Sequence, residues 1–92
     1  MSAAQAMVAE VVEENREDGI WRVSLELTLP VELKNAGPHP TLSLDLSSIG
    51  DEARAVETPK PSDSPQPTTV SVKGKPKVKV GDKLSLPIDV TA

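Results

Sequence analysis

The sequence predicts an all-β protein that folds as a single antiparallel β-sandwich of six or seven short strands with a Pro-rich loop. The first observation is the regular alternation of apolar and polar side chains from residue 21 to residue 33, which is typical of a half-buried strand. The second is the recurrence of Gly, Pro, Asn and Asp between such stretches, as expected for turns. The third is that Trp21 is the only aromatic residue, so the core must be aliphatic, mostly Val and Leu.

The length of the chain and the absence of cysteine limit its organisation. A chain of 92 residues supplies one small hydrophobic core but not two, so residues 1–92 are expected to form one domain. Without cysteine there can be no disulfide, no thiolate metal site and no cysteine nucleophile. The N-terminal residues lack the basic and apolar segments of a signal peptide, and no apolar run is long enough to span a bilayer.

A short N-terminal arm, residues 1–6, is expected to precede a first strand over residues 7–14. Apolar side chains fall on both faces of this strand, a pattern that fits a strand covered on two sides. A charged connection then ends in Asp18-Gly19, a dipeptide suited to the positive φ angles of a hairpin turn. Residues 7–14 and 20–33 are therefore expected to pair as an antiparallel hairpin.

The odd-numbered residues from 21 to 33 are expected to supply the largest share of the core. Pro30 has no N–H for a ladder hydrogen bond, so the chain should bend there. Trp21 is expected to close one end of the core, although a tryptophan in that position could also anchor a partner protein.

Shorter elements are expected to follow this long strand. Leu42–Leu46 repeats the alternation, but Ile49 has the opposite parity, which predicts a turn or bulge near residues 47–50. Residues 51–57 fit either a helical turn or a short strand. Residues 58–69 contain four prolines among polar side chains, the composition of an extended and solvated loop.

Even-numbered apolar residues from Val70 to Val90 predict further strands, separated by turns at residues 74–76 and 81–83. Within this region the segment Val-Lys-Val-Gly-Asp-Lys-Leu-Ser-Leu-Pro-Ile-Asp-Val resembles a stretch found in bacterial and phage immunoglobulin-like and cohesin-like β-sandwich domains. The resemblance covers residues 78–90 and implies an immunoglobulin-like sandwich, a fold that by itself specifies no function.

Acidic and basic residues are unevenly distributed along the chain. Residues 1–57 hold eleven Asp or Glu and four Lys or Arg, giving −7, whereas residues 58–92 hold three Asp and six Lys, giving +3; the sum is the net charge of −4. This acidic balance, with a single aromatic residue available for base stacking, argues against a nucleic-acid partner. The two regions could instead attract each other, within one molecule or between copies.

Two charged clusters are the candidate partner-binding sites. If the chain is extended after residue 72, four lysines at odd positions project from one face at intervals of about 6.6–6.8 Å. Such a ladder could bind phosphate groups or an acidic protein surface, or it could protect an exposed edge strand from unwanted pairing. The acidic hairpin tip is its natural complement, so head-to-tail contact between copies is a hypothesis. The lysines are Lys73, Lys75, Lys77 and Lys79, and the acidic residues are Glu13, Glu14, Glu17 and Asp18.

No constellation of residues predicts catalysis, so we expect a protein that is not an enzyme and that uses no cofactor, metal or small-molecule substrate. The single histidine, His39, lies between two prolines in a predicted loop, where nothing orients it as a catalytic base. The acidic residues before Gly19 lack the spacing of a calcium loop, and the five glycines form no phosphate-binding loop. No membrane partner is expected either.

These observations favour a small structural or interaction protein, an accessory or decoration subunit of a larger assembly such as a phage particle, located in the cytoplasm or the virion. As a class, cysteine-free sandwiches of this size resemble the accessory proteins of phage capsids. An alternative is a cytosolic protein-binding module or inhibitor that acts on a single protein partner. An adhesive surface domain is less favoured, because it would need an export signal.

Overall fold

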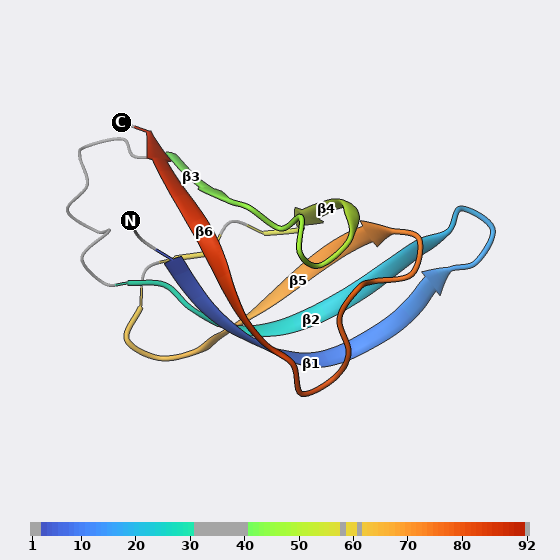
Figure 1. Cartoon of the computed structure of the whole chain (residues 1–92), viewed down its shortest axis with the longest axis horizontal. Coiled ribbons are helices and arrows are strands. Elements are labelled where there is room, and N and C mark those ends of the chain that lie inside the picture. The colour runs from blue at the N-terminus through green and yellow to red at the C-terminus, as the bar shows by residue number, and fades with distance from the viewer. Residues whose placement is uncertain (1–2, 31–40, 58, 61, 92) are drawn as a thin grey trace.

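The chain is all-β in the part that the computed structural model describes, which comprises residues 3–30, 41–57, 59–60 and 62–91 (Figure 1). Every pairing between neighbouring strands is antiparallel, as predicted. The strands are β1 (Ala3–Asn15), β2 (Ile20–Thr28), β3 (Thr41–Leu44), β4 (Asp51–Ala55), β5 (Gln66–Lys73) and β6 (Lys83–Thr91).

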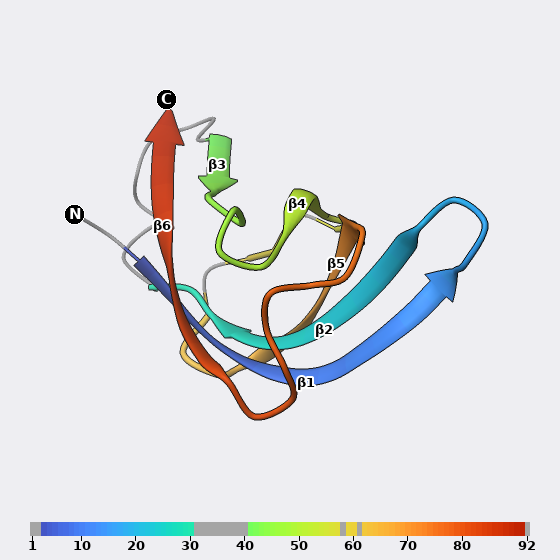
Figure 2. The ribbon, with the colours of Figure 1, turned by 45° about the vertical axis from the view of Figure 1, so that its right-hand side comes forward.

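These six strands form one sheet, in the order β3-β6-β1-β2-β5-β4. The sheet curls around a concave face, so that its two outer strands, β3 and β4, come to lie on the same side of β1 and β2 (Figures 1 and 2). A sandwich of two separate sheets is therefore not confirmed. Residues 78–80 do not form the expected strand, because the chain enters a turn at Val80 and Gly81.

The predicted β1–β2 hairpin is confirmed, and it begins earlier in the chain than expected. Its turn holds Gly19 at a φ of 69°, the left-handed value that suits an Asp-Gly dipeptide. The expected N-terminal arm over residues 1–6 is wrong for the residues that are described, because Ala3–Ala6 begin β1. Ala4 and Ala6 are buried beside β6, but alanine carries little apolar surface, so the pattern in the sequence is weak there.

β1 changes its environment at a β-bulge. The register of β1 against β2 shifts between Val8 and Glu10, so Ala9 is an extra residue in the strand. The inward face therefore moves from even to odd positions, and Val11 packs against the core. Met7 and Ala9 are exposed on the outer face, so the expectation of a strand covered on both sides is wrong.

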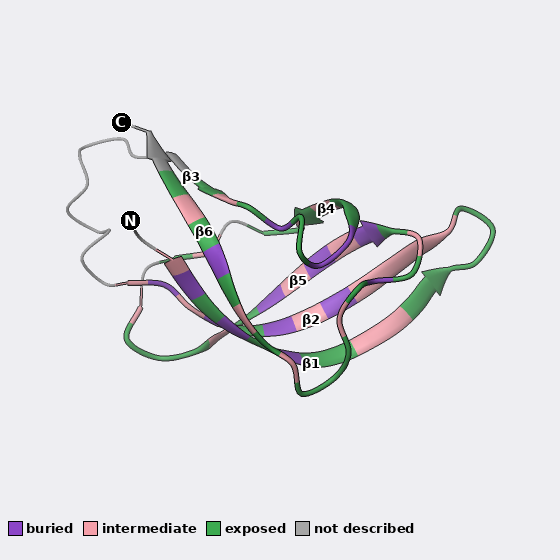
Figure 3. Ribbon diagram, in the orientation of Figure 1, coloured by how far each residue is buried: buried purple, intermediate pink, exposed green. Residues whose placement is uncertain are grey.

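Buried residues alternate with more exposed ones along the strands of the sheet (Figure 3), and the hydrophobic core that the buried residues form on its concave face is aliphatic, as predicted. β2 supplies its odd-numbered side chains, and Trp21 packs half-buried against the end of that row, as expected for a residue that closes the core. Residues 31–33, the predicted end of the long strand, lie outside the described residues. The buried core residues are Ala4, Ala6, Val8, Val23, Leu25, Leu27, Leu29, Leu46, Ile49, Val70, Val72 and Leu86.

Two connections, rather than a second sheet, cover the concave face. The turn after β3 buries Leu46 and Ile49, which confirms the predicted change of parity after this strand. Gly50 then passes so close to β5 that a Cβ atom there would overlap Cγ1 of Val72. The β5–β6 connection is held to the same turn, since the Lys77 N–H donates to the Ile49 carbonyl oxygen at 2.7 Å.

The positions of β4 and β5 test two further predictions, for residues 51–57 and for the Pro-rich loop. Residues 51–57, which fit either a helical turn or a strand, contain the edge strand β4, with Glu52 at a φ of 50° where its pairing is irregular. The Pro-rich loop expected over residues 58–69 is wrong at its C-terminal end, because β5 begins at Gln66. Pro67 is tolerated near the start of this strand, where a missing N–H disturbs the ladder least.

Candidate interaction surfaces

The acidic hairpin tip lies where β1 and β2 extend past the rest of the sheet, at one end of the molecule (Figure 1). The tip closes on itself: the Asn15 side-chain amide donates to Asp18 Oδ2 at 2.9 Å, and the Asp18 N–H donates to Asn15 Oδ1 at 3.1 Å. Arg16 Nε lies 3.7 Å from Glu13 Oε1. Glu17 makes no ion pair with another described residue, so its carboxylate is available to a partner. The predicted acidic residues, all exposed, are Glu13, Glu14, Glu17 and Asp18.

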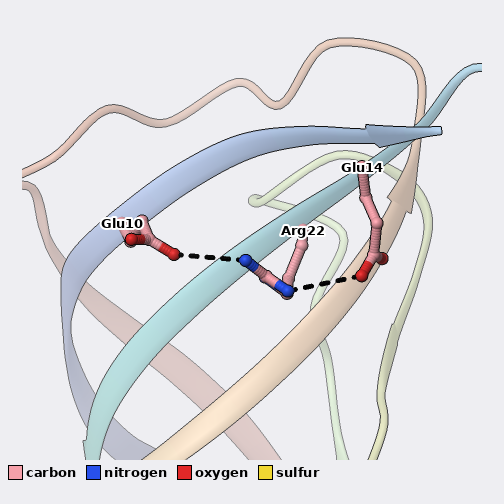
Figure 4. A network of polar contacts seen from close by, with 3 residues as sticks. All are labelled: Glu10, Glu14 and Arg22. Carbon is pink, nitrogen blue, oxygen red and sulfur yellow. Dashed lines mark hydrogen bonds and ion pairs between the residues drawn. The ribbon is translucent and has the colours of Figure 1, made fainter. Parts of the chain in front are cut away.

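The projecting part of the hairpin behind the tip, here called the arm, consists of residues 9–15 of β1 and the residues of β2 that pair with them. It carries a cross-strand ion network that includes residues not singled out from the sequence (Figure 4). Arg22 of β2 reaches two carboxylates of β1: its Nη2 lies 3.4 Å from Glu10 Oε1, and its Nη1 lies 3.3 Å from Glu14 Oε1. Arg22 is paired with Val12, and residues two positions before and after Val12 are its diagonal neighbours. This register includes an irregularity between Glu13 and Asn15, so the predicted hairpin alone did not indicate the network. Glu14 is tied to β2 rather than presented by the tip.

The four predicted lysines are exposed, but they do not form a ladder. Only Lys73 belongs to a strand, because β5 ends there and Gly74 follows at a φ of 80°. The chain then crosses the concave face, where Pro76 is buried, instead of continuing in an extended conformation. The prediction of an evenly spaced row of four lysines on one face is therefore wrong, because such spacing requires an extended chain.

Two of these lysines lie near acidic residues of β4. Lys73 Nζ is 3.9 Å from Glu52 Oε2, and Lys77 Nζ is 3.9 Å from Asp51 Oδ1. Both pairs are exposed, so each contributes little to stability. Within the part of the chain that the structure describes, Lys75 and Lys79 make no ion pair.

The arm has an unpaired strand edge along residues 9–15 of β1. On the side away from β2, β1 pairs with β6 only up to Met7. The next residue, Val8, donates its N–H to the Asp82 carbonyl oxygen at 2.9 Å and accepts from the Gly81 N–H at 2.8 Å. Beyond that point no described strand pairs with this side of β1 (Figure 1). The turn at the end of the free edge also includes Lys79, whose N–H donates to Asp82 Oδ2 at 3.0 Å.

Asp45 stabilises the turn that follows β3. The pKa of Asp45 is lowered, because the Ser47 hydroxyl and the Ser47 backbone N–H both donate hydrogen bonds to its carboxylate. The donor–acceptor distances to Asp45 Oδ1 are 2.6 Å from Ser47 Oγ and 3.0 Å from Ser47 N. These contacts assign Asp45 to the turn that carries Leu46 into the core.

Among the described residues, no group of three or more His, Asp or Glu side chains is placed to hold a metal ion. Nor does any described residue belong to a helix with the length and hydropathy of a membrane span. His39 lies outside the described residues.

No protein-family model matches the chain, and no match is found among the curated proteins or among the solved structures. The candidate surfaces therefore rest on the geometry of this chain alone.

Proposed function

We propose that this chain is a non-enzymatic structural or interaction protein, a small accessory or decoration subunit of a larger assembly such as a phage capsid. The observation that best supports the proposal is the division of the molecule into a filled body and a projecting arm. The chain's own side chains, including Leu46 and Ile49, occupy much of the concave face apart from a cavity of about 280 Å³ lined by Leu44, Ala53 and their neighbours, so the outer surfaces and edges are the main surfaces that remain for binding. A charged arm with a free strand edge suits a protein partner.

The placement of charge supports the same proposal. The acidic tip and the lysines of the β5–β6 connection are exposed and come from separate parts of the fold. Surface charges of this kind steer association and select partners more than they add affinity. The sequence support for a place in the virion is the small size of the chain and its lack of cysteine, the features by which it resembles, as a class, the accessory proteins of phage particles.

Stoichiometry tests the proposal. Affinity capture at low salt, followed by mass spectrometry, should recover the chain in many copies with a large particle. Changing the four lysines of the predicted ladder to Glu should reduce this recovery, because the basic surface would be lost. The control Lys60→Glu changes an exposed lysine outside the set and should have no effect. Failure to recover any particle would contradict the proposal.

A second candidate function is a cytosolic module or inhibitor that binds one protein. The free edge of β1 favours it, because addition of a strand to an exposed sheet edge is a recurring mode of recognition. A one-to-one complex with a single protein, in place of recovery with a particle, would support this alternative and overturn the first.

A further inference from the structure

We propose that residues 9–13 of β1 form the interface through which two copies of this chain pair antiparallel, with each acidic tip beside the Lys79–Asp82 turn of the other copy. This inference rests on the proposed function, since a contact between copies is one form of protein interaction. It deepens that function by naming a partner, a second copy of the chain. The contact is symmetric, so the head-to-tail arrangement expected from the charges becomes a two-fold one.

The backbone of the arm is the first argument. A row of unpaired N–H and C=O groups is a template for another strand. Exposed edges are usually protected by charged side chains, proline or a bulge; residues 9–13, Ala-Glu-Val-Val-Glu, have two glutamates and the bulge at Ala9, but no lysine or proline. Because β6 ends its pairing at Met7, no described strand pairs with these residues on that side.

The charges of β1 select one register for the pair. When identical strands pair antiparallel, the pair is centred on one residue, and residues directly opposite share a face. Centring on Val12 would place Glu10 opposite Glu14 of the second copy, and like charges in that position are destabilising. Centring on Val11 places Glu10 opposite Val12, and it places Glu13 at the end of the pair, opposite the bulged residue Ala9. It also leaves out Glu14, which lies at the second irregularity of β1.

The two ends of the free edge are complementary in charge. Val8 is hydrogen-bonded to residues 81–82, so Lys79 and Lys83 lie at one end of the edge, and the acidic tip lies at the other. Antiparallel pairing therefore brings the tip of one copy to the basic end of the other, twice. Val80 in the same turn is 63% exposed, an unusual position for an apolar side chain that a second copy would cover.

Sedimentation velocity over a wide range of concentrations tests the inference. At an ionic strength of about 0.01 M, where the Debye length is about 30 Å, we expect the mass of two chains. At about 1 M salt, where the Debye length is about 3 Å, a sample at the same protein concentration should contain mainly single chains. The mass of a single chain under all conditions would overturn the inference.

An exchange of charges tests the contact between tip and turn. Glu17→Lys and Lys79→Glu should each weaken dimerisation about tenfold, because each places like charges together. The double variant should restore dimerisation, since the pair is then reversed. Lys60→Glu, an exposed change away from the arm, is the control and should leave the affinity unchanged. Equal affinities for all of these variants would overturn the inference.

Cysteine cross-linking tests the register, and the natural absence of cysteine leaves no background. Val11→Cys should cross-link to its counterpart under mild oxidation, because opposed Cα atoms in an antiparallel pair lie about 4.5–5.5 Å apart, within reach of a disulfide. Ser85→Cys on β6 is exposed and should stay uncross-linked. Faster cross-linking of Val12→Cys, or equal rates at all three positions, would overturn the proposed pairing.

These outcomes are distinguishable from failure of the proposed function. A monomer that is recovered with a particle or a single protein would overturn the dimer and leave the proposed function standing. A dimer that is recovered with no other protein would support the inference and contradict the larger assembly. Binding of a basic extended peptide to the β1 edge of a monomer would assign the edge to a different partner and overturn the inference.

Discussion

The two halves of β1 differ in what surrounds them. Residues 3–8 lie between β2 and β6, and their even-numbered side chains are buried. Residues 9–15 have β2 on one side only, and their three glutamates are exposed. The first half is stabilised by burial, whereas the second is stabilised by hairpin pairing and by ion pairs with Arg22. The two halves of one strand are thus stabilised in different ways, and the second half leaves a strand edge that no described strand pairs with.

The largest expected effect comes from placing a charge in the body of the sheet. Leu27 is fully buried, and Leu27→Asp would bury a carboxylate without a partner. Because a domain of this kind has only about 5–15 kcal/mol of stability, the variant should be unfolded by circular dichroism. Leu25→Asp should behave in the same way, and the exposed neighbour Glu26→Gln should stay folded. A folded Leu27→Asp protein would show that the core is assigned incorrectly.

A matched pair of substitutions in β1 compares the two halves directly. Val8 is 1% exposed and Val12 is half-buried on the arm. Val8→Ala should lower the free energy of unfolding by about 2 kcal/mol, and Val12→Ala by less than about 1 kcal/mol. Urea denaturation measures both values. Equal losses would mean that the arm is as tightly packed as the body.

A smaller effect is expected from the ion network of the arm. A double-mutant cycle with Arg22→Gln and Glu14→Gln should give a coupling free energy of about 0.2–1 kcal/mol, because both side chains are exposed and screened by solvent. The coupling should fall as salt is added. In both single variants, hydrogen exchange of the backbone amides should be faster than in the unchanged protein over residues 9–15 and the same over residues 3–8. Faster exchange in both halves would show that the arm and the body open together.

The smallest effect is expected from Asp45, which belongs to the body. Its pKa is lowered in the folded state, so its contribution to stability is present above the unfolded pKa of about 3.9 and is lost as the pH falls through the folded pKa. Asp45→Asn should therefore make the urea midpoint less sensitive to pH below about pH 4. Ser47→Ala removes one of the hydrogen bonds and should have part of the same effect. An unchanged pH profile in both variants would contradict this role for Asp45.

The hairpin and the core face of β2 could be predicted because their signals are local. An Asp-Gly dipeptide specifies its own turn, and alternation over residues 23–29 specifies which side chains are buried. The acidic tip follows from the same hairpin. The Arg22 network could not be predicted in the same way, because it depends on a hairpin register that shifts between Val8 and Glu10 and again between Glu13 and Asn15.

The single curled sheet and the path of the lysine segment could not be predicted from the sequence, because strand pairing depends on contacts with distant residues. Residues 78–80 alternate as a strand does, yet the chain there is held by contacts made elsewhere. Pro76 is buried, and the Lys77 N–H is bonded to Ile49 of the preceding turn. Those contacts draw the lysines across the sheet, and nothing in the alternation itself indicates them.

The bulge at Ala9 has a consequence for variation in chain length. A deletion within a regular stretch of strand turns the side chains beyond it to the opposite face. Deletion of Ala9 would instead join Val8 to Glu10 with every later residue still opposite its present partner in β2. The deletion would change the direction in which the arm projects, because a bulge bends its strand and increases the local twist. Proteins with this fold could therefore gain or lose one residue at this point, keep the same core, and aim the arm differently.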